Sequence, residues 1–165
     1  MILSRHQFEV QDILRILAPI SGKVVELATV PDPVFSEKLT GDGCAILADG
    51  SDVLAPIDGE ITLFFETKHA FAITGADGVQ VLVHIGLDTV ILDGEGITAL
   101  HHMGEHVTAG TPILRLDLPV LQKHHINLIS PVLIVNYDKV RHLTPAPAIG
   151  EEVAAGRDCV LQYAV

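Results

Sequence analysis

The amino-acid sequence predicts an all-β fold, an antiparallel β-sandwich of short strands. The chain has 165 residues, a length that fits one globular domain. Hydrophobic residues make up 48% of it, which supplies a core and argues against disorder. Fourteen Gly and nine Pro residues divide the chain into short segments, a pattern typical of sandwiches and barrels.

Along the chain, β-branched runs bounded by turn residues predict strands at residues 24–25, 79–83 and 132–135. Helices are expected to be few. Near the N-terminus four apolar residues recur at helical intervals: Val10, Ile13, Leu14 and Leu17. Because Pro19 ends that run, we expect at most one or two helical turns there, and the same near residues 118–125.

Two pairs of similar segments indicate an internal duplication. Ala-Pro-Ile-Ser-Gly-Lys-Val at residues 18–24 resembles Ala-Pro-Ile-Asp-Gly-Glu-Ile at 55–61. Gly-Glu-His-Val-Thr-Ala-Gly at 104–110 likewise resembles Gly-Glu-Glu-Val-Ala-Ala-Gly at 150–156. Recurrent turn chemistry accounts for each copy alone. Two matched pairs favour two similar β units packed together.

The charge balance restricts the kinds of partner. The formal net charge is −11 at pH 7, which repels phosphate backbones and anionic lipid, so we expect no nucleic-acid partner and no direct membrane insertion. A basic protein partner fits better. No apolar run is long enough to span a bilayer, and charged residues interrupt any signal-peptide core. Cys44 and Cys159 lack CxxC spacing, which predicts two reduced thiols in a cytosolic protein.

A predicted hairpin brings two histidines together. Its strands flank Gly-Ala-Asp-Gly at residues 75–78, and an Asp-Gly pair between β runs is typical of an antiparallel hairpin. Pairing Thr74 with Val79 places His69 directly opposite His84, with Cβ atoms about 4.5–5.5 Å apart. This register assigns the other side chains to two faces: Phe71 with Leu82 on the histidine face, and Ala70, Ala72, Val81 and Val83 on the other. A slip of one residue would separate the histidines.

Two facing imidazoles disfavour simultaneous protonation, so at least one stays neutral near pH 7. The neutral ring offers a nucleophilic nitrogen, and its neighbour can donate a hydrogen bond to an anion. Thr67 is placed to fix the tautomer of His69, and Gly86 lets backbone groups approach His84. The arrangement fits transient phosphoryl transfer through a histidine, and also a two-histidine metal site that needs further ligands. The remaining histidines are expected to be structural or solvated.

Several segments follow one family pattern in order. They are Val-Pro-Asp (30–32), Val-Phe-Ser-Glu-Lys (34–38), Gly-Asp-Gly (41–43), Ala-Pro-Ile-Asp-Gly (55–59), Glu-Thr-Lys-His-Ala-Phe (66–71), Val-His-Ile-Gly-Leu-Asp-Thr-Val (83–90) and Gly-Glu-Gly (94–96). On these segments the sequence resembles the glucose-type IIA component of the bacterial phosphoenolpyruvate-dependent sugar phosphotransferase system. The resemblance covers roughly residues 17–163.

The resemblance implies a cytoplasmic β-sandwich described as a duplicated hybrid motif, with residues 1–16 as an N-terminal tail and 17–165 as the phosphocarrier domain. It implies a phosphotransferase component with a phosphohistidine intermediate, which takes a phosphoryl group from HPr and passes it to the IIB unit of a sugar permease. In this scheme His84 carries the phosphoryl group, His69 stabilises it, and Thr67 orients His69. The backbone at Gly86 accepts a hydrogen bond from the other nitrogen of His84.

The resemblance also implies a docking surface and further partners. An apolar rim is expected around the histidines, formed by Val34, Phe35, Leu39, Phe65, Phe71 and Val90. Asp32 and Asp88 match acidic positions that would steer a basic HPr surface. Lys68 stands where many relatives have Asn. No cofactor is required, but the unphosphorylated form can bind transport or metabolic proteins, and zinc can be shared between His69, His84 and such a partner.

Two other functions are considered. A metal-dependent hydrolase on a similar β scaffold would use a two-histidine zinc site, but it needs a third ligand, and the H-x-H pair of comparable peptidases is absent from the sequence. A lipoyl or biotinyl carrier would be modified on Lys68. The chain is much longer than such a module, however, and the paired histidines would have no role in it.

Overall fold

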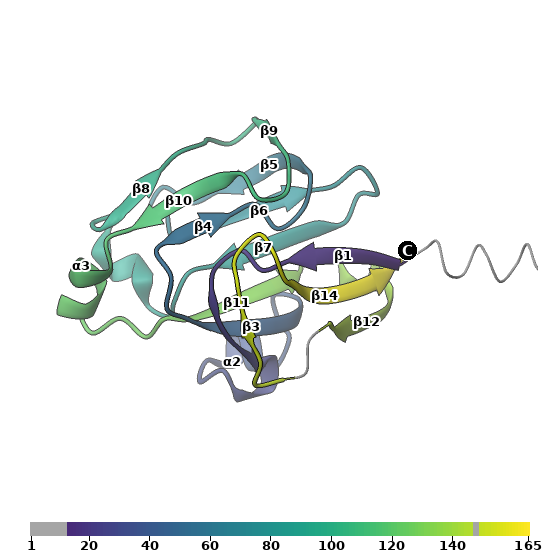
Figure 1. The fold of residues 1–165 in the computed structure, drawn as a ribbon, viewed down its shortest axis with the longest axis horizontal. Coiled ribbons are helices and arrows are strands. Elements are labelled where there is room, and N and C mark those ends of the chain that lie inside the picture. The colour runs from purple at the N-terminus through teal and green to yellow at the C-terminus, as the bar shows by residue number, and fades with distance from the viewer. Residues whose placement is uncertain (1–12, 147–148) are drawn as a thin grey trace, which may run out of the picture.

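A computed structural model describes residues 13–146 and 149–165. Its strands form one sheet of eight strands and two sheets of three (Figure 1). All strand pairings between them are antiparallel. The predicted all-β, antiparallel sandwich is therefore confirmed.

The large sheet is symmetric about its centre. Its strands are β2 (Gly22–Glu26), β3 (Asp42–Ala48), β5 (Gly59–Phe64), β6 (Ala70–Thr74), β7 (Gln80–His84), β9 (His106–Val107), β11 (Ile129–Ile134) and β13 (Glu152–Val153). They lie in the order β13-β2-β3-β11-β7-β6-β5-β9. The half that begins with β13 and the half that begins with β9 therefore have the same arrangement, joined where β11 pairs with β7.

The two small sheets also correspond to each other. One holds β1 (Ile13–Leu17), β14 (Cys159–Ala164) and β12 (Arg141–Pro145), and the other holds β4 (Asp52–Leu54), β10 (Pro112–Leu116) and β8 (Ile97–Ala99). Helical structure in the described residues is short: α2 (Pro33–Ser36), α3 (Leu118–Lys123) and the 3₁₀ turns η1 (Leu27–Thr29), η2 (Thr89–Leu92) and η3 (Tyr137–Lys139). Of the two expected helical regions, the one near residues 118–125 is found as α3.

The prediction of helical turns near the N-terminus is wrong. Ile13, Leu14 and Leu17 lie in β1, which pairs with β14 along its whole length, while Val10 lies outside the described residues. Pairing with a neighbouring strand and burial of Ile16 outweigh the weak helical spacing. The folded part of the chain therefore includes residues 13–16, which were assigned to the tail.

The repeated segments occupy equivalent places, which confirms the duplication. Gly22 pairs with Val153, and Gly59 pairs with Val107. Each Gly-Glu-x-Val segment thus forms an edge strand next to the strand that begins at the glycine of one Ala-Pro-Ile-x-Gly segment. The two Ala-Pro-Ile segments also exchange hydrogen bonds: Leu17 N donates to Pro56 O at 3.0 Å, and Leu54 N donates to Pro19 O at 2.7 Å. These bonds join the two units into one domain.

One segment breaks the symmetry and covers the outer face of the large sheet. Residues 27–41, between β2 and β3, contain η1 and α2, whereas the equivalent connection between β5 and β6 spans only residues 65–69. α2 lies below β3 in Figure 1. Leu27, Val30 and Phe35 pack there on a second apolar cluster, formed by Ala45, Ala70, Ala72, Leu82, Leu87 and Leu133. This packing places α2 beside the end of β7.

The symmetry predicts matched effects of two glycine substitutions. A Cβ at Gly22 would lie 2.2 Å from Leu47 O, and one at Gly59 would lie 2.2 Å from Thr74 O. Because both obstacles are backbone carbonyls within the sheet, we expect Gly22→Ala and Gly59→Ala each to lower the free energy of unfolding by about 1–3 kcal/mol. Urea denaturation measures this. Gly50→Ala is the control, since its Cβ would come no closer than 3.3 Å to another atom, Ser21 Cβ. A loss confined to one of the two variants would contradict the equivalence.

Candidate functional site

The hairpin that carries the site is shifted by one residue from its predicted register. Thr74 pairs with Gln80, not Val79, and His84 pairs with Ala70, not His69. The reason lies in the turn: Gly78 N donates to Gly75 O and Gly75 N donates to Val79 O, each at 3.0 Å. Gly78 has a left-handed backbone with φ of 84°. A three-residue turn closed by a left-handed glycine adds one unpaired residue, and this shifts the register.

The shift changes which side chains share a face. Phe71 lies opposite Val83 in the main core between the sheets, and Ala72 lies opposite Leu82 on the outer face. The predicted pairing of Phe71 with Leu82 is therefore wrong. His84, opposite Ala70, belongs to the outer face that α2 covers.

The two histidines nevertheless meet. His69 precedes β6, so it does not follow the alternation of the strand, and Lys68 before it has a left-handed backbone with φ of 65°. The imidazole rings of His69 and His84 lie edge to face, with centroids 4.8 Å apart and planes at 81°. The rings do lie together as predicted. A turn before β6 brings His69 to His84, and the two residues are not paired directly across the strands.

His84 is oriented by the backbone that follows it. Its Nδ1 lies 2.8 Å from Gly86 O. A carbonyl only accepts, so Nδ1 carries the proton and the lone pair of the neutral ring is on Nε2. Gly86 has φ of 68°, and a Cβ there would lie 2.8 Å from Asn127 O, so the position requires glycine.

His69 is buried, with a residue exposure of 3%, and is held by its neighbours. Thr67 Oγ1 lies 2.6 Å from His69 Nδ1, and the Phe65 ring packs edge-on with its centroid 5.1 Å away. When Thr67 donates to Nδ1, the ring proton is on Nε2 and is available to a ligand. Burial, and then the proximity of His84, lower the pKa of His69 to about 4. The ring is therefore neutral at physiological pH.

The segment at α2 completes the surroundings of His84. The Phe35 ring packs on the imidazole, with centroids 5.0 Å apart and planes at 60°. Asp32 caps α2 by accepting from Val34 N at 3.1 Å. Burial lowers the pKa of His84, opposed by its hydrogen bond to Gly86 and by the charge of Asp32. Both histidines are thus disposed to be neutral nucleophiles or donors.

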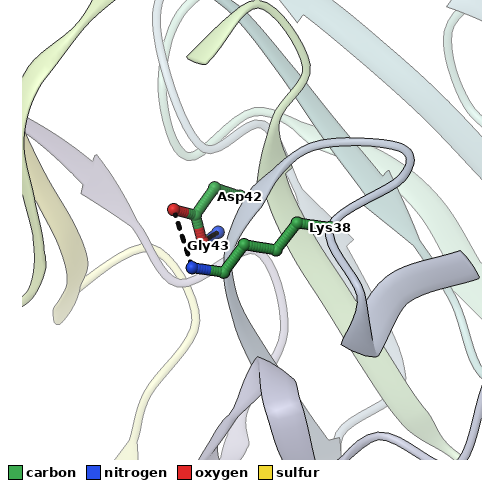
Figure 2. Close-up of polar contacts among 3 residues, drawn as sticks. All are labelled: Lys38, Asp42 and Gly43. Atoms are coloured by element: carbon green, nitrogen blue, oxygen red, sulfur yellow. Dashed lines mark hydrogen bonds and ion pairs between the residues drawn. The ribbon is translucent and has the colours of Figure 1, made fainter. Parts of the chain in front are cut away.

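The turn after α2 is tied to the start of β3. Figure 2 shows the Lys38 side chain reaching Asp42, with Nζ 3.4 Å from Oδ2, while the other carboxylate oxygen accepts from Gly43 N at 2.8 Å. The ion pair is partly exposed and contributes little energy by itself. Gly43 in the Gly-Asp-Gly motif has a separate cause, because a Cβ there would lie 2.1 Å from Val132 O.

The residues predicted to form the docking rim divide into two groups. Val34, Leu39, Phe65 and Val90 are exposed, and so are Asp88 and the neighbouring Ile91, which the sequence analysis did not select. Phe71 does not belong to the rim, because it is fully buried on the inner face of β6. Phe35 is also buried, at 5% exposure, and contributes through its contact with His84. Ile91 is exposed because of its place in the η2 turn, and the sequence does not specify the geometry of that turn.

The described part of the chain contains no complete metal site. Among residues 13–146 and 149–165, no group of three or more His, Cys, Asp or Glu side chains is arranged to hold a metal ion. His69 and His84 alone supply two nitrogen ligands, fewer than a closed zinc site uses. A metal there would need ligands from a second protein.

Comparison with known proteins gives consistent results. The family described as "phosphoenolpyruvate-dependent sugar phosphotransferase system, EIIA 1" matches residues 14–140. The "PTS system glucose-specific EIIA component" of Oceanobacillus iheyensis is 38% identical over 149 residues, 90% of this chain and 89% of that protein. The "PTS system glucoside-specific EIICBA component" of Staphylococcus carnosus is 43% identical over 121 residues, 73% of this chain and 18% of that protein.

A solved structure is similar over almost the whole chain. Glucose permease IIA from Mycoplasma capricolum superposes with a TM-score of 0.79 and 38% identity, covering 91% of this chain and 95% of its own. Within the described residues, no helix has both the length and the apolar character needed to cross a membrane.

The buried histidine predicts a pH dependence of stability. The unfolded chain binds a proton on His69 at its ordinary pKa of 6.5, whereas the folded chain binds it only near 4. Since the unfolded state holds more protons between these values, the free energy of unfolding falls as pH decreases from about 6.5 to 4, by at most about 3 kcal/mol from this residue. His69→Gln is expected to flatten the profile in urea denaturation. The exposed His102→Gln is the control, and an unchanged profile for His69→Gln would contradict the assignment.

Proposed function

The chain belongs to the EIIA 1 family of the phosphoenolpyruvate-dependent sugar phosphotransferase system, and we propose that it carries the phosphoryl group of that system on Nε2 of His84. It is thus a phosphocarrier in sugar transport. The observation that supports His84 is its hydrogen bond to Gly86 O at 2.8 Å, which leaves the Nε2 lone pair free for attack. The transfer proceeds through a phosphohistidine, a covalent intermediate of a phosphotransferase component.

In the proposed step, the Nε2 lone pair of His84 forms a bond to phosphorus while the bond from phosphorus to the donor breaks, and its electron pair leaves with the donor. Passing the group on reverses these events with an acceptor. His69 donates from Nε2 to a phosphoryl oxygen, and Thr67 keeps that proton in place by bonding Nδ1, 2.6 Å away. Because such transition states are largely dissociative, positioned donors contribute more than covalent activation.

The proposed donor is HPr and the proposed acceptor is the IIB unit of a sugar permease, in the cytoplasm. The name EIICBA of the Staphylococcus carnosus relative supports the acceptor, since it joins an A unit to B and C units. Both partners would use one docking rim, defined as the exposed Val34, Leu39, Phe65, Val90 and Ile91. Asp32 and Asp88 beside it favour a basic partner and raise the association rate.

Regulatory binding fits the same surface. We propose that the unphosphorylated form docks on transport or metabolic proteins, and that the charge of a phosphoryl group on His84 opposes this docking. Zinc held by Nε2 of His69, Nε2 of His84 and a partner carboxylate requires the other tautomer of His69, in which Nδ1 donates to Thr67 Oγ1. The alternative of a metal-dependent hydrolase gains no support, because its third ligand is not found among the described residues.

The proposed carrier role is tested by intact mass after incubation with phosphoenolpyruvate, enzyme I and HPr. We expect one acid-labile phosphoryl group on the wild type and none on His84→Ala. His69→Ala is expected to accept the group but to pass it on poorly, because it loses a donor to the phosphoryl oxygens. The exposed His106→Ala is the control. No label on the wild type, with HPr labelled normally, would contradict the proposal.

The docking rim predicts the effect of added charge. Val90→Glu places an uncompensated carboxylate in an apolar contact, and we expect the rate of phosphoryl transfer from HPr at low concentration to fall about tenfold or more. Tyr137→Glu is the matched control, since Tyr137 is an exposed apolar residue at the opposite end of β7 from His84. Its turn, η3, is held at the start of β7 by the hydrogen bond from Gln80 N to Asn136 Oδ1, 2.9 Å long. Equal losses in both variants would indicate a general effect of charge instead of docking at this rim.

A further inference from the structure

Four hydrogen bonds hold the two peptide groups on either side of Gly86, the glycine that orients His84. On one side, Gly86 N donates to Ser130 Oγ at 3.0 Å, and Ile85 O accepts from Thr89 Oγ1 at 2.6 Å. On the other side, Leu87 N donates to Asn127 O at 2.9 Å, and Gly86 O accepts from His84 Nδ1 at 2.8 Å. The two peptide planes that flank the Gly86 Cα are therefore each fixed at both ends.

Ser130 completes this network of hydrogen bonds from the neighbouring strand β11. Its hydroxyl accepts from Gly86 N and donates to Leu128 O at 2.9 Å, so both of its hydrogen-bonding functions are used. The residue lies in β11 and is fully buried. It cannot touch a phosphoryl group on Nε2 of His84, and any influence on the reaction must pass through Gly86.

From this geometry we propose that Ser130 is a positioning residue for phosphoryl transfer. Its hydroxyl holds the peptide before Gly86 and thereby the left-handed turn at Gly86, so that the carbonyl in the following peptide, Gly86 O, keeps the proton of His84 on Nδ1. The inference rests on the proposed role of His84. A carbonyl that turns away from Nδ1 allows the proton to move to Nε2, and a ring protonated there has no lone pair for attack.

The chemistry of the side chain distinguishes Ser130 from simple packing. Ala at this position fills nearly the same space but leaves the buried Gly86 N–H without an acceptor, which is costly. The left-handed turn at Gly86 can then relax, since the peptide on its N-terminal side keeps only the bond from Thr89. Thr retains the hydroxyl and should preserve the arrangement. A purely steric role predicts instead that Ala is tolerated.

Two measurements on the full chain test the role. The tautomer of His84 is read from ¹⁵N NMR of the ring, and single-turnover transfer from phosphorylated HPr gives the maximal rate and the half-saturating concentration. For Ser130→Ala we expect a mixture of tautomers and a maximal rate about tenfold lower, with the half-saturating concentration unchanged, because docking is not involved. Ser130→Thr should restore both. Ile113→Val, a buried change on β10 in a different sheet from β7 and β11, controls for loss of stability.

The outcomes separate this inference from the carrier role. If Ser130→Ala keeps a single Nδ1-protonated tautomer and the wild-type rate, the positioning role is overturned even though His84 is phosphorylated. If the wild type takes no phosphoryl group, the carrier role fails, and the tautomer comparison alone still decides whether Ser130 acts on His84. Should Ser130→Ala not fold, Ser130→Cys, which keeps the size but offers a weak acceptor, replaces it with the same expectations.

Discussion

The antiparallel pairing of β7 with β11 determines where every other part of the site can lie. In this register Val83 is opposite Val132, at the centre of the large sheet, where the two halves of the molecule meet. Past His84 the register shifts by one residue: Leu87 lies opposite Asn127, where the alignment within β7 would give Leu128, and Gly86 N reaches Ser130 Oγ. The chain leaving β7 is thus held against β11, and its carbonyl at Gly86 is fixed on His84.

The duplication explains the framework but not the site. The two halves supply equivalent strands, edge strands and glycine contacts in the large sheet, and the two small sheets correspond to each other. The functional groups come from the connections that differ. Residues 27–41 bring Asp32 and Phe35 to the outer face, and the shorter connection between β5 and β6 brings Thr67 and His69. Because these connections differ, only one of the two halves has a facing histidine pair among the described residues.

Sequence reasoning predicted which residues lie together better than how the backbone arranges them. The spacing of Thr67, His69, His84 and Gly86 selected residues that do lie together, because short-range contacts such as Thr67 to His69 depend on few intervening residues. Register depends on the backbone conformation of a single residue, Gly78, and the sequence does not specify whether a turn will include a bulge. That one residue moved Phe71 from the expected rim to the core. β1 was missed for a different reason, since its pairing with β14 joins residues about 150 positions apart, beyond any local pattern.

The surroundings of His84 suit a group that is held briefly and passed on. The groups in contact with its ring are a backbone carbonyl, a neutral imidazole and a phenyl ring, at Gly86, His69 and Phe35. None carries a positive charge, and Asp32 lies close enough to influence the titration of the ring. A phosphoryl group on Nε2 would therefore gain hydrogen bonds from neutral donors but little charge compensation from its contacts. A basic docking partner would supply that compensation only while bound, which favours movement of the group between proteins over its retention.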